Sequence, residues 1–132
     1  MRDITKSWVE FAKRDLKAAE ELLNDEFLAN VVLFHSQQAV EKLTKALLEE
    51  LLLGIPRVHS IKTLSSRLPD NIRESIFSDV DEIDLLDDIY INERYPSEMG
   101  ILPDGFPTRD RAKSIYDIAN KLCNKILSCL VS

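Results

Sequence analysis

The chain reads FHSQQAVEKLTKALL from Phe34 to Leu48, in the middle of a long and largely apolar run. Apolar residues recur there at steps of three and four, which is the spacing of a helix with a buried face. Polar and ionisable residues stand on or beside that face: His35, Gln38, Glu41, Lys42 and Lys45. Because buried polar groups need hydrogen-bond partners, we expect another helix, a second subunit or a ligand to supply them. The stretch therefore indicates architecture and association more than chemistry.

Composition places the chain among globular helical proteins. It has 132 residues, 45% of them hydrophobic, with only 3 glycines, which predicts one all-α domain over residues 1–132. The net charge of −6 disfavours general binding to nucleic acid. The start, from Met1 to Lys6, lacks the apolar core of a signal peptide, and no apolar run is long enough to span a membrane. We therefore expect a cytoplasmic protein.

The hydrophobic pattern predicts an up-and-down bundle of four long helices plus one short helix. The first helix should bury a stripe that includes Trp8 and Phe11, and the second, apolar from Phe27 onward, should be central. Ser60 and Thr108 are expected to cap helices, and Gly54 to end one. A long loop rich in proline and glycine precedes the last helix. The expected helices cover residues 6–24, 26–53, 60–67, 72–92 and 109–130, and the loop covers 93–107.

Neither the cysteines nor the acidic residues form a recognisable metal site. Cys123 and Cys129 lie six residues apart on one helix, so they point in different directions and neither pair nor share a metal ion. The acidic residues from Asp79 to Asp88 could place three carboxylates on one face, but no second group of ligands completes a site. We interpret this stretch as a solvated face and expect no bound metal.

Four segments, in order, resemble those of HEPN-domain proteins (higher eukaryotes and prokaryotes nucleotide-binding). Residues 8–19 resemble the first helix of that family and residues 37–48 the second. His59-Ser60-Ile61-Lys62-Thr63-Leu64 is similar to its short helix that opens with histidine. Arg94-Tyr95-Pro96 resembles the loop element before its last helix. The resemblance implies a helical bundle that is commonly dimeric and often encoded beside a minimal nucleotidyltransferase.

Many HEPN proteins are ribonucleases or toxins with an Arg-x4-6-His motif, and this chain lacks it. His59 has leucines and a glycine at the required spacing, and Arg57 lies only two residues before it. The resemblance therefore favours a non-catalytic, homodimeric protein that binds ATP or another nucleotide and partners a separate nucleotidyltransferase, as in a toxin–antitoxin module. The alternatives are a divergent ribonuclease, using His35 or His59 with Arg57 or Arg94, and a helical adaptor without a ligand.

The candidate site residues form two sets. Arg94 offers a bidentate fork for phosphate and Tyr95 a stacking face, although both could instead anchor the loop. For the histidines, a structural hydrogen bond is the more ordinary role, while Glu41 and Lys45 fit a solvated face or a partner helix equally well. We assign to ligand binding Arg94, Tyr95, Lys42, Lys45, Arg109, Arg111 and His59. We assign to an interface His35, Gln38 and Glu41, and no residue to catalysis.

Overall fold

The structure, a computed structural model, describes residues 1–94 and 105–131, with only the backbone described at 92–94. Within these ranges every regular element is a helix, which confirms the all-α prediction. The elements are α1 (Asp3–Leu22), the 3-10 helix η1 (Glu26–Leu28), α2 (Ala29–Glu50), α3 (Ile61–Ser65), α4 (Asp70–Ile76), α5 (Val80–Arg94) and α6 (Arg109–Val131).

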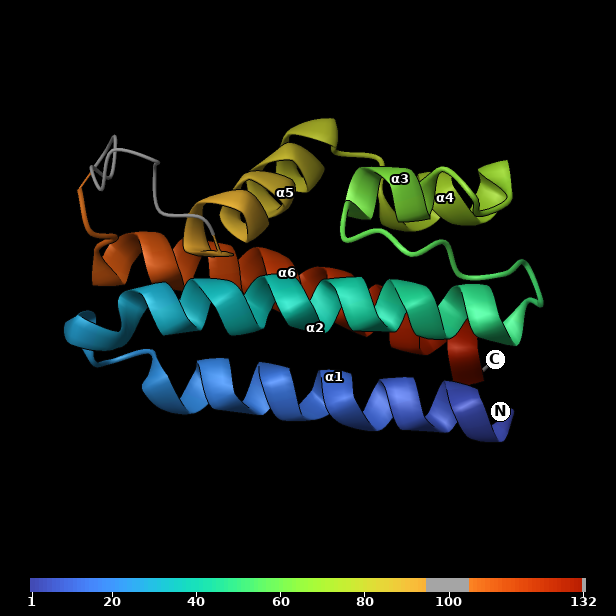
Figure 1. The fold of residues 1–132 in the computed structure, drawn as a ribbon, viewed down its shortest axis with the longest axis horizontal. Helices are drawn as coiled ribbons and strands as arrows, with labels where there is room; N and C mark the ends of the chain where they lie inside the picture. The colour runs from blue at the N-terminus through green and yellow to red at the C-terminus, as the bar shows by residue number, and fades with distance from the viewer. Residues whose placement is uncertain (95–104, 132) are drawn as a thin grey trace.

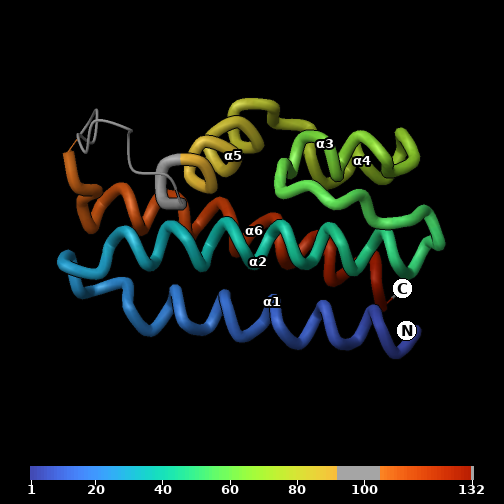
Figure 2. The backbone as a smooth tube through the Cα atoms, viewed as in Figure 1, coloured from blue at the N-terminus to red at the C-terminus, as the bar shows by residue number. Residues whose placement is uncertain are grey.

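Helix α2 is the central element, as its apolar sequence predicted. It packs most extensively against α1 and α6, and it also contacts α3, α5 and η1. Figure 1 shows α1 running antiparallel along one side of α2, α6 behind α2, and α3 to α5 in a layer on the side away from α1. The tube in Figure 2 traces the same path and places both chain ends at one end of the bundle. Fourteen residues of α2 are buried, so its surface toward solvent is narrow.

The buried face of α1 differs from the predicted stripe. Val9, Ala12 and Ala19 are buried as the helical spacing requires, but the side chain of Phe11 is 59% exposed. The small side chains of Ala12 and Ala19 let α1 lie close to α2, so the line of contact passes through them. Phe11 therefore stays at the edge of the contact instead of in the core, and its predicted burial is wrong.

Both ends of α2 also depart from prediction. Residues 26–28 form a 3-10 turn in which Phe27 is 90% exposed instead of buried. At the other end the helix closes at Glu50, where the amide of Leu53 donates to the carbonyl of Leu48 at 3.0 Å. Leu52, with φ of 58°, takes the left-handed position that terminates the helix, a role expected of Gly54.

The helix predicted over residues 72–92 is wrong, because the structure has two helices there. α4 ends at Ile76, the buried Phe77 leaves helical geometry, and α5 begins at Val80. The carboxylate of Asp79 accepts from the amides of Asp81 at 3.0 Å and Glu82 at 3.3 Å, which caps α5. An aspartate three residues before a glutamate is the sequence signal for such a start.

The remaining caps agree with the sequence. The hydroxyl of Ser60 accepts from the Thr63 amide at 3.1 Å, and that of Thr108 accepts from the Arg111 amide at 3.1 Å. The predicted stripe of α6 is buried throughout: Ala112, Ile115, Ala119, Leu122, Ile126 and Leu130. Of the predicted loop, residues 95–104 lie outside the described residues. None of the described helices combines the length and apolarity that crossing a bilayer requires.

Candidate functional site

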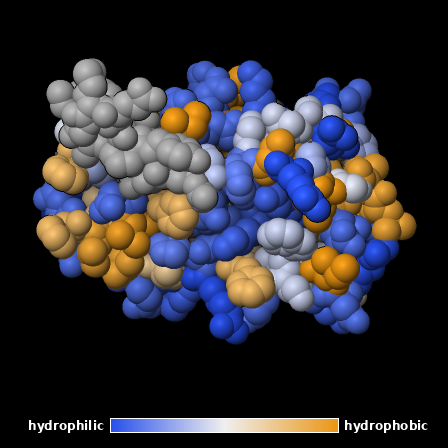
Figure 3. All heavy atoms as spheres, viewed as in Figure 1, coloured by the Kyte–Doolittle hydropathy of each residue, from blue (hydrophilic) through white to orange (hydrophobic). Residues whose placement is uncertain are grey.

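The polar residues singled out in the sequence gather on the face of α2 that lies between α1 and the layer of α3 to α5. Figure 1 shows α1 and the layer of α3 to α5 on opposite sides of α2, with α6 behind α2. Figure 3, drawn from the same side, shows a band of hydrophilic atoms across the middle, with separate apolar patches above it, below it and toward both ends. Two buried carboxylates, one from α1 and one from α2, organise the polar part.

The first carboxylate belongs to Asp15, a residue of α1 that is only 8% exposed. Its Oδ1 lies 2.8 Å from Nδ1 of His35, and its Oδ2 lies 2.6 Å from Nζ of Lys42. An ionised carboxylate only accepts hydrogen bonds, so Nδ1 is the nitrogen that donates. The lysine nitrogen also lies 5.9 Å from the ring centroid of Phe11, within the range of a cation–π contact. Asp15 thus ties α1 to two side chains of α2.

The second carboxylate belongs to Glu41, which is 3% exposed. Gln37 donates to its Oε1 at 3.2 Å, Lys45 donates to its Oε2 at 3.1 Å, and Nδ1 of His59 lies 3.2 Å from the same Oε2. The nitrogen of Lys45 also lies 5.5 Å from the ring centroid of Trp8. Each carboxylate therefore has partners of the same two kinds, its own histidine and its own lysine. In each case the lysine lies over an aromatic ring of α1.

These contacts decide between the alternatives that the sequence left open. Glu41 and Lys45 do not lie on a solvated face, because both are buried, with Lys45 over Trp8 of α1 and Glu41 against His59. Taking a charge out of water costs several kcal/mol unless partners compensate it, and here they do. Gln38 belongs to the same network, donating from Nε2 to Oε1 of Gln37 at 2.8 Å. The side chains of the two histidines stay 29% and 50% exposed, and their hydrogen bonds within the described residues go through Nδ1.

The residues that follow His59 are bound by Asp87, an acidic residue that was predicted to lie on a solvated face. Asp87 of α5 accepts from the Ser60 hydroxyl at 2.9 Å and from the Ile61 and Lys62 amides at 2.7 and 3.2 Å. This carboxylate caps the start of α3. One turn further along α5, the ring of Tyr90 stacks on the His59 ring with centroids 4.6 Å apart. The solvated-face interpretation is wrong for Asp87, and also for Glu82, which pairs with Lys121.

The described members of the predicted ligand set fall into two groups. Lys42, Lys45 and His59 lie on the α2 face, whereas Arg109 and Arg111 lie at the start of α6, beside η1. At 1.5 Å per residue, Lys42 lies about 20 Å along α2 from Ala29, the residue at which α2 begins next to η1. The Arg109 amide already donates to the carboxylate of Glu26 at 3.3 Å, so the positive end of α6 faces an anion of its own chain.

Two predicted residues cannot be placed with this set. Arg94 is the last residue of α5, and only its backbone is described, while Tyr95 lies outside the described residues. Their assignment to a ligand stays a prediction. Over the ranges that the structure describes, no group of His, Cys, Asp or Glu side chains is arranged to hold a metal ion.

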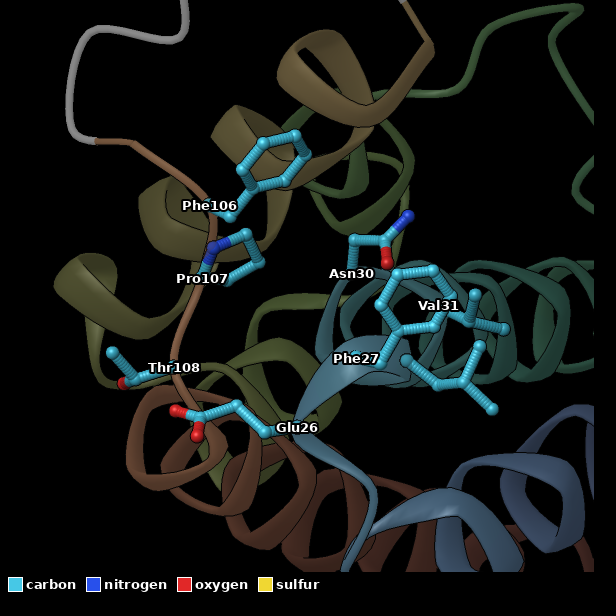
Figure 4. Close-up of a pocket in the computed structure, with 8 residues that line it drawn as sticks. Glu26, Phe27, Asn30, Val31, Phe106, Pro107 and Thr108 are labelled. Atoms are coloured by element: carbon cyan, nitrogen blue, oxygen red, sulfur yellow. The ribbon is translucent and has the colours of Figure 1, made fainter.

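A pocket that sequence reasoning missed opens where η1 meets the start of α6. Its volume is about 820 Å³, and its lining residues are Glu26, Phe27, Leu28, Asn30, Val31, Phe106, Pro107 and Thr108. Figure 4 shows Phe106 and Pro107 on one side and Phe27, Asn30 and Val31 on the other. Both phenylalanines are more than four-fifths exposed. The signal in the sequence was a pair of aromatic residues, Phe27 near the start of the helix predicted over 26–53 and Phe106 near the end of the predicted loop.

The sequence matches the HEPN domain family over residues 5–129. The chain belongs to the HEPN domain family. Among solved structures, it is similar to TT1696 from Thermus thermophilus, with 27% identity, a TM-score of 0.79, and coverage of 96% of this chain and 98% of that one. It is also similar to ST0689, an archaeal HEPN homologue, with 26% identity, a TM-score of 0.69, and coverage of 97% and 98%. A comparison with curated protein sequences gave no match.

Proposed function

We propose that this HEPN protein is non-catalytic, forms a homodimer and acts as the nucleotide-binding partner of a separately encoded minimal nucleotidyltransferase, in a module of the toxin–antitoxin kind. The observation that carries the proposal is the state of its two histidines. Each ring gives Nδ1 to a buried carboxylate, and neither ring forms a hydrogen bond or ion pair with an arginine whose side chain the structure describes. A ribonuclease site of the family's kind needs histidine and arginine together, so these rings fit a structural role better.

A nucleotide would need cationic and stacking groups on a chain whose net charge is −6. Because phosphates repel carboxylates, those groups must be locally concentrated. We assign this role to Arg94 for the phosphates and Tyr95 for the base. The exposed Arg109 and Arg111 side chains at the start of α6 add charge. Lys42 and Lys45 are weaker candidates, because Asp15 and Glu41 already hold their charges.

Three measurements test the proposal. Light scattering should give twice the chain mass of 15.1 kDa. Co-expression with a nucleotidyltransferase encoded next to this protein should yield a complex that co-purifies. Calorimetric titration should detect ATP binding that weakens by about 1–3 kcal/mol in Arg94→Ala, the range for a lost charged hydrogen bond. A monomer that neither binds ATP nor retains the nucleotidyltransferase would contradict the proposal, and a dimer that does neither would be a helical adaptor.

A second candidate is a divergent RNA-cleaving enzyme, and one feature favours it. A histidine that gives Nδ1 to a carboxylate is oriented as a general base is in many enzymes. Both His35 and His59 give Nδ1 to a carboxylate, and their side chains are 29% and 50% exposed. Incubation with tRNA and mRNA tests it directly. Cleavage that disappears in His35→Ala or His59→Ala would replace the first proposal, whereas intact RNA would leave the non-catalytic assignment in place.

A further inference from the structure

A row of apolar side chains on α1 is only partly covered by the described residues. Ile4, Trp8 and Phe11 follow the i, i+4, i+7 spacing of one helix face, and we call them the α1 stripe. Ile4 is 56% exposed and Phe11 59% exposed, with the partly buried Trp8 between them. Exposed apolar rows of this kind mark contact surfaces more often than single exposed residues do. Tryptophan is also one of the residue types enriched at the centres of interfaces.

The α1 stripe is bordered by lysines whose charge is neutralised within the chain. Lys42 lies over Phe11 and pairs with Asp15, and Lys45 lies over Trp8 and pairs with Glu41. The surface next to the two rings thus contains charged atoms whose charges are already paired. A partner of either sign would gain little there from electrostatic attraction.

Most of the other charges near the α1 stripe are also paired within the chain. Arg2 pairs with Glu49 at 3.2 Å, the terminal amine lies 3.8 Å from Glu50, and Arg14 pairs with Glu10 at 3.2 Å. Among residues 1–15, the charges that form no ion pair with another described residue are one acid, Asp3, and two bases, Lys6 and Lys13. This part of an acidic chain is therefore not acidic itself.

The surplus of negative charge lies elsewhere. Exposed carboxylates that no described residue pairs with include Asp84 and Asp88 on α5 and Asp110 on α6. Two copies of a chain with a net charge of −6 repel each other, and the repulsion is greatest where such carboxylates would meet. The exposed Val80 and Ile91 of α5 stand among them. Self-association through α5 is disfavoured, and self-association through the α1 stripe is not.

We propose that the α1 stripe, with Lys42 and Lys45 at its border, is the surface through which two copies of this chain pair about a two-fold axis. The inference rests on the homodimer of the proposed function and names its interface. In such a pair the same patch serves both subunits, so it must be compatible with itself. A row of apolar side chains flanked by internally paired charges meets that condition.

A single substitution tests the surface, with a matched control on another helix. Phe11→Asp introduces two carboxylates into the pair at a position exposed enough to leave the fold intact. We expect the dimer to dissociate, with a dissociation constant higher by on the order of 100-fold, as for the loss of a central aromatic contact. Val80→Asp, at a residue 55% exposed on α5, should leave the dimer unchanged. Analytical ultracentrifugation gives both constants, and circular dichroism verifies that both variants fold.

Cross-linking provides a second readout that does not depend on the stability of Phe11→Asp. In a Cys129→Ala background, Phe11→Cys treated with a short bis-maleimide should form covalent dimers at low protein concentration, and Val80→Cys should not. A wild-type monomer would overturn the homodimer and this inference together. A wild-type dimer that persists in Phe11→Asp, or that cross-links through residue 80 and not residue 11, would overturn the interface alone.

Discussion

Glu41 and His59 lie 18 residues apart in sequence, and the hydrogen bond between them at 3.2 Å joins α2 to the start of the α3 to α5 layer. The same carboxylate accepts from Lys45, which lies over Trp8 of α1. One buried anion thus connects three parts of the bundle. Its effect on stability should be much larger than that of a surface ion pair.

Replacing Glu41 by alanine should lower the free energy of unfolding by about 3–5 kcal/mol, because it leaves the Lys45 charge buried without a partner. Urea denaturation followed by circular dichroism measures the change. Glu10→Ala removes an ion pair with Arg14 in which both side chains are more than 60% exposed. That control should cost less than about 1 kcal/mol. Equal losses in the two variants would show that the Glu41 network contributes no more than a surface pair.

Asp87→Ala should destabilise the protein by about 2 kcal/mol, because three donors at the start of α3 lose their acceptor. Asp88→Ala is the matched control, since its side chain is the exposed neighbour on the same helix. Hydrogen exchange should show faster exchange of the Ile61 and Lys62 amides in the first variant only. Unchanged exchange there would mean that α3 is held by its packing and not by this cap.

Whether the sequence predicted a contact depended on how many residues along the chain separate the two partners. Ser60 and Thr108 cap helices through bonds to residues three positions away, so local sequence patterns identified both. Asp87 caps a helix that begins 26 residues earlier, and nothing in its neighbourhood in the sequence indicates that contact. The hydrogen bond between Glu41 and His59 likewise joins residues 18 positions apart, which local sequence patterns do not connect.

Two departures from the predicted helices concern features that apolar spacing does not report: where the chain leaves a helix, and how closely two helices approach. The apolar spacing continues from Ile76 to Val80 across the break, so a pattern of three and four did not reveal that Phe77 leaves the helix to enter the core. On α1, the spacing located the buried face only approximately. Which side chain lies at its edge depends on how closely Ala12 lets the neighbouring helix approach.

Acid should remove a contribution to stability from Glu50. Its pKa is lowered by the hydrogen bond that the Arg2 amide donates at 2.9 Å, with help from the Thr5 hydroxyl and the terminal amine. A group whose pKa is lower in the folded state stabilises the fold above its ordinary value, here 4.5, and stops doing so as the pH falls through the folded value. The difference in stability between wild type and Glu50→Gln should therefore shrink below about pH 4.5. A difference that is constant with pH would contradict this linkage.

The two cysteines should differ sharply in reactivity. Burial raises the pKa of the Cys123 thiol to about 12, whereas Cys129 is only partly buried. The thiolate is the reactive form, so at pH 8 the fraction of Cys123 that can react in the folded protein is on the order of 10⁻⁴. Titration with Ellman's reagent should modify one thiol in the native protein and the second only in urea.

Cys129→Ala identifies which thiol reacts. The variant should lose the native-state reaction and keep the reaction seen in urea, and Cys123→Ala should do the reverse. The native reaction should also leave the helical content unchanged, because Cys129 lies near the end of α6, whereas Cys123 is 0% exposed in the core against which α2 packs. Fast native modification in Cys129→Ala would mean that α6 opens at Cys123 far more often than its packing implies.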